Sequence, residues 1–456
     1  MKHAIVMGGS MAGLVAARVL SDCFDKVTLV EQDVFPLKAE NRRGVPQGRH
    51  THGLLAGGRQ ALEQLFPGLS EQAVREGAAA GDIAGKSRWF VEGGCMAQFE
   101  SGLTALAMSR PFLENLVRQR VLQIPNVTSR QGTHVDRLMF RQDFRRVIGI
   151  MCGTEAIAAD LVIDATGRGS RTPQWLEAAG YQRPREERVE VSLGYTTRHF
   201  RRRASDLNGD IAVVIPPTPD GKRGGVMVAQ EAERWTVTLI GHFGHYAPED
   251  LEGFIEFART LPAPYIFESI RNAEPVSEPA SARFPASIRR RYEKLARFPE
   301  AYLVTGDAIC SFNPIYGQGM SVAALEGLEL QRWLRSGATD ARGFFSRISN
   351  IVDIPWNIAV GSDLRIPETV GPRNARVKFI NWYMAKLHRA AHGDPVPALA
   401  FHTVANLLTT PAAVLDPRVA WRVLCRGPLC RGSRPQIGAG LQRVRLKPDP
   451  TTQPTV

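Results

Sequence analysis

Short apolar runs alternate with small-residue turns over the first thirty residues of the chain. Residues 4–7 form an apolar run typical of a buried strand, and the small residues of 8–13 follow it. Residues 14–20 have a helical pattern, and residues 27–30 form a second apolar run that ends at Glu31. This order of strand, glycine turn, helix, strand and acid predicts a dinucleotide-binding unit.

Each polar or small residue of this unit has an expected role. Gly8 permits the tight turn, Gly13 permits close packing of the helix on the strand, and Ser10 takes the place of the usual middle glycine. The free N–H groups at the start of the helix suit a pyrophosphate. Glu31 can accept hydrogen bonds from ribose hydroxyls and disfavours a 2′-phosphate, so we expect FAD or NAD rather than NADP.

Similar signals return far downstream. Residues 159–164 form an apolar strand before the turn Ala165-Thr166-Gly167, and residues 302–305 form another before Gly306-Asp307. Residues 314–320 form a glycine-containing loop, and residues 321–334 have a helical pattern. An NAD dehydrogenase would complete its sheet within about a hundred residues of the first strand. The later return of nucleotide-type signals predicts a discontinuous domain.

The middle of the chain has a different pattern. Runs at 189–196, 211–215, 225–229 and 235–241 alternate or read as short strands with turns between them, and a helix is expected at 248–261. This predicts an antiparallel sheet inserted between the nucleotide motifs. The aromatic residues of this insert could line a substrate pocket or pack in the core: Phe200, Trp235, Phe243, Tyr246, Tyr265 and Phe267.

Composition excludes several classes of protein. Of 456 residues, 44% are apolar and 22% charged, which is typical of a globular chain and not of a disordered one. The net charge is +12, but the basic residues are scattered, so we do not expect nucleic-acid binding. The six cysteines show no zinc-like spacing, and His50 and His52 lack an evident third ligand, so we expect no metal and free thiols in the cytoplasm.

Taken together, these motifs resemble the FAD-dependent monooxygenases of the aromatic hydroxylase and squalene epoxidase type. The resemblance covers roughly residues 1–370 and includes the segment from Pro46 to His50. It implies an α/β fold: a Rossmann-like, discontinuous FAD-binding domain with an inserted antiparallel β-sheet substrate domain and a helical C-terminal region. We expect FAD-binding parts at 1–184 and 286–340, the substrate sheet at 185–285, helices at 341–430 and a loose tail at 431–456.

The resemblance also implies roles for further residues. Asp307 would bind the ribityl chain, Pro314 would lie beside the flavin ring, and Arg110 would reach the phosphate or ribityl region. Arg49 lies in a loop expected near the flavin. Backbone N–H groups would face the pyrimidine edge and phosphate from Gly317, Gln318, Gly319 and Met320. No acid–base catalytic residue is assigned, because the cofactor carries the chemistry.

The predicted function is therefore that of an FAD-dependent monooxygenase. A flavin C4a-hydroperoxide would hydroxylate or epoxidise an apolar or phenolic small molecule. Thr166-Gly167 replaces the Asp-Gly turn that serves the nicotinamide donor in the aromatic hydroxylases. NAD(P)H would then act as a transient electron donor, or a partner protein would supply the electrons.

Other interpretations stay open at this point. One is an FAD-dependent reductase of isoprenoid double bonds, and another is a non-catalytic FAD or nucleic-acid binding protein. The basic amphipathic segment 376–389 could rest on a membrane surface, but we expect it to cap the core without membrane contact. The chain has no run of about 18 apolar residues, so we expect no membrane span.

Overall fold

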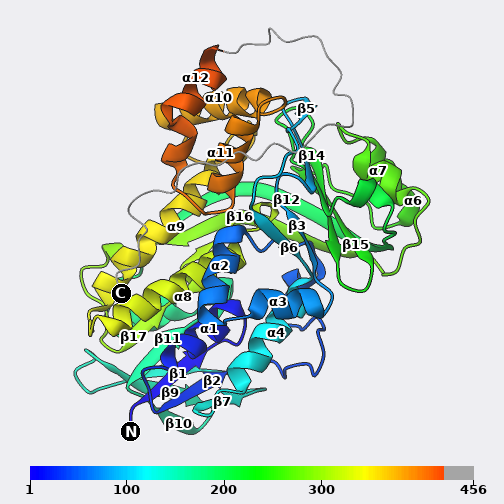
Figure 1. The fold of residues 1–456 in the computed structure, drawn as a ribbon. Helices are drawn as coiled ribbons and strands as arrows, with labels where there is room; N and C mark the ends of the chain where they lie inside the picture. Colours follow the sequence, from blue (N-terminus) through cyan, green and yellow to red (C-terminus); the bar gives the residue numbers. More distant parts are fainter. Residues whose placement is uncertain (426–456) are drawn as a thin grey trace.

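A five-stranded parallel sheet lies at the N-terminal end of the molecule (Figure 1). The computed structural model describes residues 1–425. The strand order is β17-β11-β1-β2-β7, and each neighbouring pair is parallel. The bounds are β1 (His3–Met7), β2 (Lys26–Val30), β7 (Val127–Arg130), β11 (Leu161–Asp164) and β17 (Tyr302–Val304). Strands from three distant parts of the chain thus build one sheet, as the separated sequence signals predicted.

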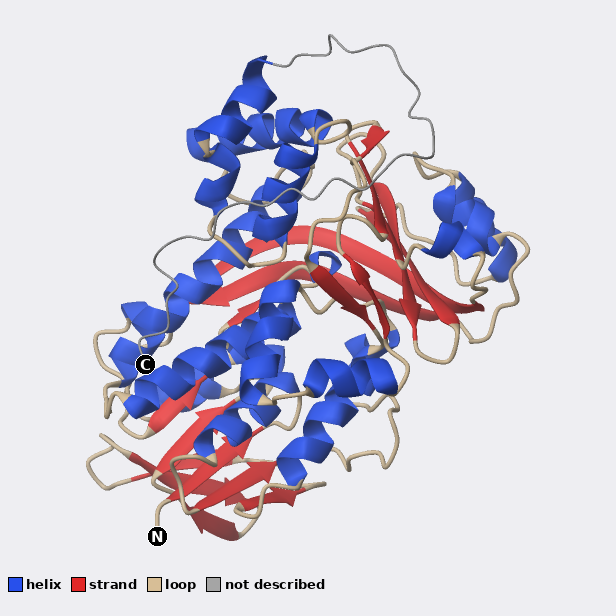
Figure 2. Cartoon of the chain, viewed as in Figure 1, coloured by secondary structure: helices blue, strands red, loops and turns tan. Residues whose placement is uncertain are grey.

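Helices pack against this sheet and against one another (Figure 2). They are α1 (Met11–Leu20), α2 (Ala56–Leu65), α3 (Leu69–Arg75), α4 (Arg110–Leu122) and α8 (Gly319–Arg335). Glycines allow α8 to pack tightly: a Cβ on Gly327 would lie 2.0 Å from Val15, and one on Gly58 would lie 2.5 Å from Ser321. A small antiparallel sheet of β8 (Arg137–Phe140), β9 (Val147–Cys152) and β10 (Glu155–Ala158) adjoins β11.

A second, eight-stranded sheet has the order β18-β16-β12-β15-β14-β13-β4-β5. Its strands pair antiparallel except β13 with β4. The bounds are β4 (Ser87–Val91), β5 (Gly94–Cys95), β12 (Glu186–Arg201), β13 (Ala212–Ile215), β14 (Arg223–Gln230), β15 (Arg234–His242), β16 (Ala280–Arg290) and β18 (Cys310–Ser311). Residues 185–285 therefore supply most of this sheet, and strands from the flanking segments complete it. A separate pair, β3 (Ala79–Asp82) and β6 (Thr104–Ala107), lies nearby.

The two faces of this sheet have different partners. On one face, Phe200 and Trp235 are fully buried in a core with Phe254 of α6 (Leu251–Arg259) and Ile266 of α7 (Tyr265–Ile270). On the other face, Leu193 and Tyr195 belong to the core of the nucleotide-type domain. Phe200 and Trp235 are therefore core residues and do not line a substrate pocket, because their side chains lie on the face of the sheet covered by α6 and α7.

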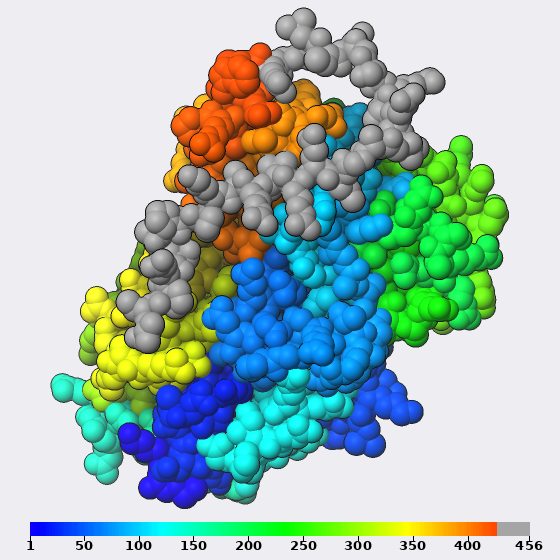
Figure 3. Space-filling view, viewed as in Figure 1, coloured from blue at the N-terminus to red at the C-terminus, as the bar shows by residue number. Residues whose placement is uncertain are grey.

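Four α-helices form the described part of the C-terminal region, residues 341–425. These are α9 (Ala341–Asp363), α10 (Ala375–Ala390), α11 (Pro395–Ala405) and α12 (Pro417–Cys425). The last three project as a separate lobe at the end of the molecule opposite the N-terminus (Figure 3). The predicted α/β fold class is confirmed. The predicted tail at 431–456 lies outside the described residues. Within residues 1–425, no helix is long and apolar enough to cross a membrane.

Candidate functional site

The glycine turn after β1 has the geometry that its sequence predicted. Gly8 has φ +97°, and a Cβ on it would lie 2.5 Å from the carbonyl oxygen of Ala165. A Cβ on Gly13 would lie 1.8 Å from the carbonyl oxygen of Gly8. No other residue fits either position, because these clashes are with backbone atoms. The start of α1 is thereby held against the turn that follows β11.

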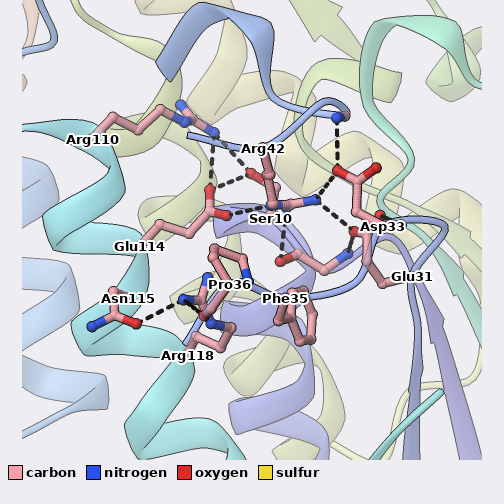
Figure 4. Close-up of polar contacts among 12 residues, drawn as sticks. Ser10, Glu31, Asp33, Phe35, Pro36, Arg42, Arg110, Glu114, Asn115 and Arg118 are labelled. Atoms are coloured by element: carbon pink, nitrogen blue, oxygen red, sulfur yellow. Dashed lines mark hydrogen bonds and ion pairs between the residues drawn. The ribbon is translucent and has the colours of Figure 1, made fainter. Parts of the chain in front are cut away.

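A charged cluster surrounds this turn (Figure 4). The N–H groups of Gly9 and Asp33 donate to the carboxylate of Glu31 over 2.7 and 2.9 Å. Arg42 forms ion pairs with Glu31 at 3.2 Å, Asp33 at 3.1 Å and Glu114 at 2.9 Å. Burial would lower the pKa of Arg42, but Glu114 and Glu31 outweigh it and hold that pKa above its usual value. Sequence reasoning missed Arg42, because a loop outside the motif carries it.

Ser10 connects the first helix to α4. Arg110 Nη2 donates to Ser10 Oγ over 2.8 Å, and Ser10 Oγ donates to Glu114 Oε2 over 2.9 Å. Ser109 caps α4 by accepting from the N–H of Phe112, so Arg110 stands on the first turn of the helix. Within the described residues, the buried Nε of Arg110 has no hydrogen-bond partner. Ser10, which replaces the usual middle glycine, therefore connects the start of α1 to α4 through its hydroxyl group.

Asp307 lies across from Arg110, at the end of β17. Among residues 1–425 its carboxylate forms no hydrogen bond or ion pair. Burial raises the pKa of Asp307, while the facing guanidinium groups of Arg110 and Arg168 lower it. A Cβ on Gly319 would lie 3.8 Å from its carboxylate. Asp307, Arg110 and the start of α8 thus converge on one region, and the carboxylate is free to accept from a ligand.

Hydrogen bonds to the last residue of α9 fix the loop before α8. Pro314–Tyr316 form a short 3-10 helix, Gly317 has φ +64°, and α8 begins at Gly319. Asn313 Nδ2 and the Tyr316 hydroxyl both donate to Asp363 Oδ1, each over 2.8 Å. Burial raises the pKa of Asp363 to about 7, although both hydrogen bonds lower it. Sequence reasoning missed Asp363, because only the tertiary fold brings it to the loop.

The remaining predicted loop residues have varied surroundings. Pro314 is half-buried, Met320 is buried, and Gln318 is buried with no partner for its Oε1 within residues 1–425. A Cβ on Gly317 would lie 3.5 Å from Gly53, so the segment after His52 passes directly over this loop. Arg49 ends the 3-10 helix Pro46–Arg49 with its side chain exposed. The structure therefore places Arg49 at the surface, and its contact with a cofactor stays a prediction.

His50 connects the segment that follows the 3-10 helix Pro46–Arg49 to the large sheet. Its Nδ1 lies 2.9 Å from Thr197 Oγ1, and its ring packs edge-on against Tyr195 at 4.5 Å. Thr197, Thr238 and Thr51 continue this chain of hydroxyls over 2.7 and 2.8 Å. Burial, with Arg49 adding, lowers the pKa of His50 to about 4, so the ring is neutral at pH 7. The sheet beside His50 therefore carries a row of hydrogen-bonded hydroxyls next to the Tyr195 ring.

His52 lies beside Arg110. Its Nδ1 is 3.0 Å from the carbonyl oxygen of His50, which can only accept, so Nδ1 carries the proton. Burial, with Arg110 adding, lowers the pKa of His52 to about 3. The Nε2 atom is then an acceptor. Across residues 1–425, no group of three or more His, Cys, Asp or Glu side chains is arranged to hold a metal ion.

The residues present fit a dinucleotide. Two glycines keep the turn open, Arg110 Nε and Gln318 Oε1 are buried without partners among residues 1–425, and the Asp307 carboxylate accepts no hydrogen bond there. Arg110 would supply a cation to a diphosphate, and Asp307 and Gln318 would supply acceptors to a polyol chain. The two glycines allow the backbone to approach the diphosphate closely. The structure brings Gly8, Ser10, Gly13, Glu31, Arg110, Asp307 and Gly319 into one region. Their contacts with a cofactor stay predictions.

Comparison with known proteins gives one relative in sequence and many in structure. No family model matches the chain. Protein Rv3254 of Mycobacterium tuberculosis is 37% identical over 365 residues, which cover 75% of this chain and 74% of that protein. In structure, the flavin-dependent brominase Bmp2 matches with a TM-score of 0.65 at 12% identity, covering 89% of this chain and 94% of Bmp2.

Two further solved structures have the same architecture. A flavoprotein/dehydrogenase from Cytophaga hutchinsonii matches with a TM-score of 0.65 at 15% identity, over 89% of this chain and 92% of its own. PqsL, a probable FAD-dependent monooxygenase from Pseudomonas aeruginosa, matches with a TM-score of 0.60 at 15% identity, over 90% and 100%. The resemblance expected from the sequence is confirmed at the level of the fold.

Proposed function

The chain belongs to the same family as Protein Rv3254 of Mycobacterium tuberculosis, and we propose that it is an FAD-dependent oxidoreductase, specifically a monooxygenase of an apolar or phenolic small molecule. One observation carries the proposal: the Asp307 carboxylate, which accepts no hydrogen bond within residues 1–425, faces Arg110 where α1 and α8 begin. Asp307 would accept from a polyol hydroxyl, and Arg110 would bind an oxygen of the diphosphate. A flavin dinucleotide contains both groups.

The rest of the cofactor site follows from the same geometry. Glu31, at the end of β2, would bind the adenosine ribose, and the free N–H groups at the start of α1 would face the diphosphate. Pro314 and the N–H groups of residues 317–320 would hold the ring. Bound FAD would supply the electron transfer and oxygen activation that side chains cannot. In this arrangement residues 1–184 and 286–340 bind the cofactor, and residues 185–285 bind the substrate.

The chain's own residues would position the substrate and exclude water. His50, Tyr195 and Thr197 lie where the large sheet meets the loop before α8, and all three are buried. His50 and Thr197 already hydrogen-bond within the protein, and the Tyr195 ring packs on His50, so this wall is preorganised and presents aromatic surface. An apolar or phenolic molecule suits such a wall better than a charged one. No proton transfer is assigned to His50, which stays neutral.

The electron donor is expected to bind only transiently. Thr166, at the turn after β11, uses both its N–H and its hydroxyl to bond Asp164, over 2.9 and 2.6 Å. The Thr166 hydroxyl is therefore used within the turn, and it does not replace the carboxylate that the aromatic hydroxylases have at this position. NAD(P)H that binds transiently, or a partner protein, would supply the electrons. The five cysteines of the described part are free thiols, which supports the cytoplasm as the compartment of this reaction.

The test begins with cofactor content. The purified chain is denatured, the released flavin is identified, and apoprotein is titrated with FAD. Reduced protein is then mixed with air and candidate phenols while oxygen uptake and product are followed. We expect FAD to bind and oxygen to be consumed with a hydroxylated or epoxidised product. A chain that cannot be loaded with FAD overturns the proposal, whereas substrate reduction without oxygen uptake replaces the monooxygenase by a double-bond reductase.

A further inference from the structure

The C-terminal lobe, residues 375–425, exposes an unusual amount of apolar surface. Of thirteen large hydrophobic side chains that are exposed in residues 1–425, six belong to this lobe: Phe379, Ile380, Trp382, Leu415, Trp421 and Leu424. Phe379 is 54% exposed, Trp382 49% and Trp421 57%. Single exposed apolar residues are normal, but a concentration of them in one lobe indicates an interaction surface.

Helix α10 does not bury the face that its sequence pattern suggested. Of the expected apolar stripe, Leu387 is buried, Val377 and Met384 are half-buried, and Ile380 is exposed. The helix packs on α11 and α12 mainly through Tyr383 and Leu387. Its first two turns therefore have little contact with the rest of the protein. The expectation that this segment caps the core fits its second half, where Tyr383, Leu387 and His388 are buried, and does not fit its first two turns.

One side of α10 combines aromatic rings with cations. At about 100° per residue, Lys378, Phe379, Trp382, Lys386 and Arg389 fall within an arc of about 100°. The Phe379 and Trp382 rings lie 5.7 Å apart, and Lys386 Nζ lies 5.1 Å from the Trp382 ring. We call these five residues the interfacial face. It contains no acidic residue, and α10 itself has none.

The whole lobe has a positive net charge, like the interfacial face. Besides the three cations of the interfacial face, the lobe carries Arg376, Arg418 and Arg422, against only Asp394 and Asp416. Asp394 is buried and pairs with Arg422 at 2.7 Å. Positive surface beside exposed Trp and Phe suits a layer that has anionic groups outside and apolar chains beneath. A second copy of this lobe would bring like charges together.

We propose that the interfacial face of α10 docks the protein on the surface of an anionic phospholipid bilayer. Phe379 and Trp382 would enter the boundary between headgroups and acyl chains, while Lys378, Lys386 and Arg389 would bind lipid phosphates. The protein would lie on the bilayer without crossing it. The flavin chemistry proposed above is not required for this inference, and either can fail without the other.

The test is vesicle flotation with the purified full-length protein. We expect binding to phosphatidylcholine vesicles that contain about 30% phosphatidylglycerol, and much weaker binding to phosphatidylcholine alone. Binding should weaken when salt is raised from about 0.1 M to about 0.5 M. The double variants Phe379→Ala/Trp382→Ala and Lys378→Glu/Lys386→Glu should each lower the partition coefficient about tenfold or more.

Matched controls come from the hairpin of β8 and β9, at the opposite end of the molecule (Figure 1). Phe144 there is 51% exposed, and Arg137 and Arg145 are exposed. Phe144→Ala and Arg137→Glu/Arg145→Glu should leave vesicle binding unchanged. Equal binding to neutral vesicles, or equal loss in the hairpin variants, overturns the proposal. So does a dimer in light scattering that Phe379→Ala/Trp382→Ala dissociates, because the face would then be covered by a second copy.

Discussion

The hydroxyl of Tyr316 donates a 2.8 Å hydrogen bond to Asp363, although 47 residues separate the two in the chain. Tyr316 belongs to the loop that leads into α8, and Asp363 is the last residue of α9. Asn313 donates to the same oxygen, so one buried carboxylate fixes both ends of the short 3-10 helix at Pro314. The C-terminal region thus determines the shape of the loop that would face the flavin ring.

Removing this link should loosen the loop. In Asp363→Ala, the buried donors of Asn313 and Tyr316 lose their acceptor, which should lower the free energy of unfolding by about 1–3 kcal/mol. Tyr316→Phe removes one donor and should have a smaller effect. Both variants should weaken FAD binding, measured by titration of apoprotein, with Tyr316→Phe weaker by about threefold to tenfold.

The control for this pair is Tyr181→Phe. The Tyr181 hydroxyl also donates one hydrogen bond, to the carbonyl of Phe144, but at the surface and away from the loop. Its removal should leave FAD affinity unchanged. If Tyr316→Phe and Tyr181→Phe bind FAD equally well, Asp363 serves stability alone and does not position the loop.

Stability should fall as pH rises through neutrality. Burial raises the pKa of Asp363 to about 7, and burial likewise raises that of Glu326 to about 7. A carboxyl whose pKa is raised by folding binds more protons in the folded state than in the unfolded state. Its contribution is fully present below the unfolded pKa of about 4 and is lost as pH rises through about 7.

Chemical denaturation of the FAD-free protein between about pH 5 and about pH 8 measures this effect. We expect the free energy of unfolding to drop by about 1–4 kcal/mol over that range. Asp363→Asn and Glu326→Gln should each flatten the slope, because neither amide titrates. An unchanged slope in both variants would show that other groups cause the pH dependence.

The sequence predicted those parts of the site that depend on neighbours in the chain. Gly8, Gly13 and Glu31 have fixed spacings around one strand and one helix, and Asp307 lies three residues after the end of β17 in the same sheet. Since parallel strands end at one edge, such residues can be placed together without knowing the rest of the fold. The fold class followed from the same regularity.

Arg42 and Asp363 could not be found in this way. Arg42 reaches three carboxylates only because its loop returns over the turn at Gly9, and Asp363 meets Tyr316 only because α9 packs behind the loop. Neither belongs to a periodic pattern. The core position of Phe200 and Trp235 was also ambiguous, because both faces of β12 and β15 carry apolar residues. Alternation separates the two faces but does not say which one meets the cofactor domain.

Arg110 and Arg120 provide a matched comparison on one helix. Arg110 Nη2 binds Ser10, whereas Arg120 lies on α4 too but donates to Gln72 and to the carbonyls of Phe66 and Pro67. Arg110→Ala should weaken FAD binding about tenfold to a hundredfold, since a charge-assisted hydrogen bond to the diphosphate is lost. Arg120→Ala should lower stability without changing FAD affinity. Equal affinities of the two variants would remove Arg110 from the cofactor site.

Asp307 provides the sharpest test of the cofactor site, because its carboxylate has no partner within residues 1–425. Asp307→Asn is nearly isosteric and removes a charge that accepts no hydrogen bond within residues 1–425 but is faced by Arg110 and Arg168, so the free energy of unfolding of the FAD-free variant should change by less than about 1 kcal/mol. Its FAD affinity should nevertheless fall about tenfold, since a charged acceptor for the ribityl hydroxyls becomes a neutral one. Asp220→Asn, at an exposed carboxylate, is the control and should change neither quantity. Loss of stability together with unchanged FAD affinity in Asp307→Asn would mean that this carboxylate supports the fold and does not contact the cofactor.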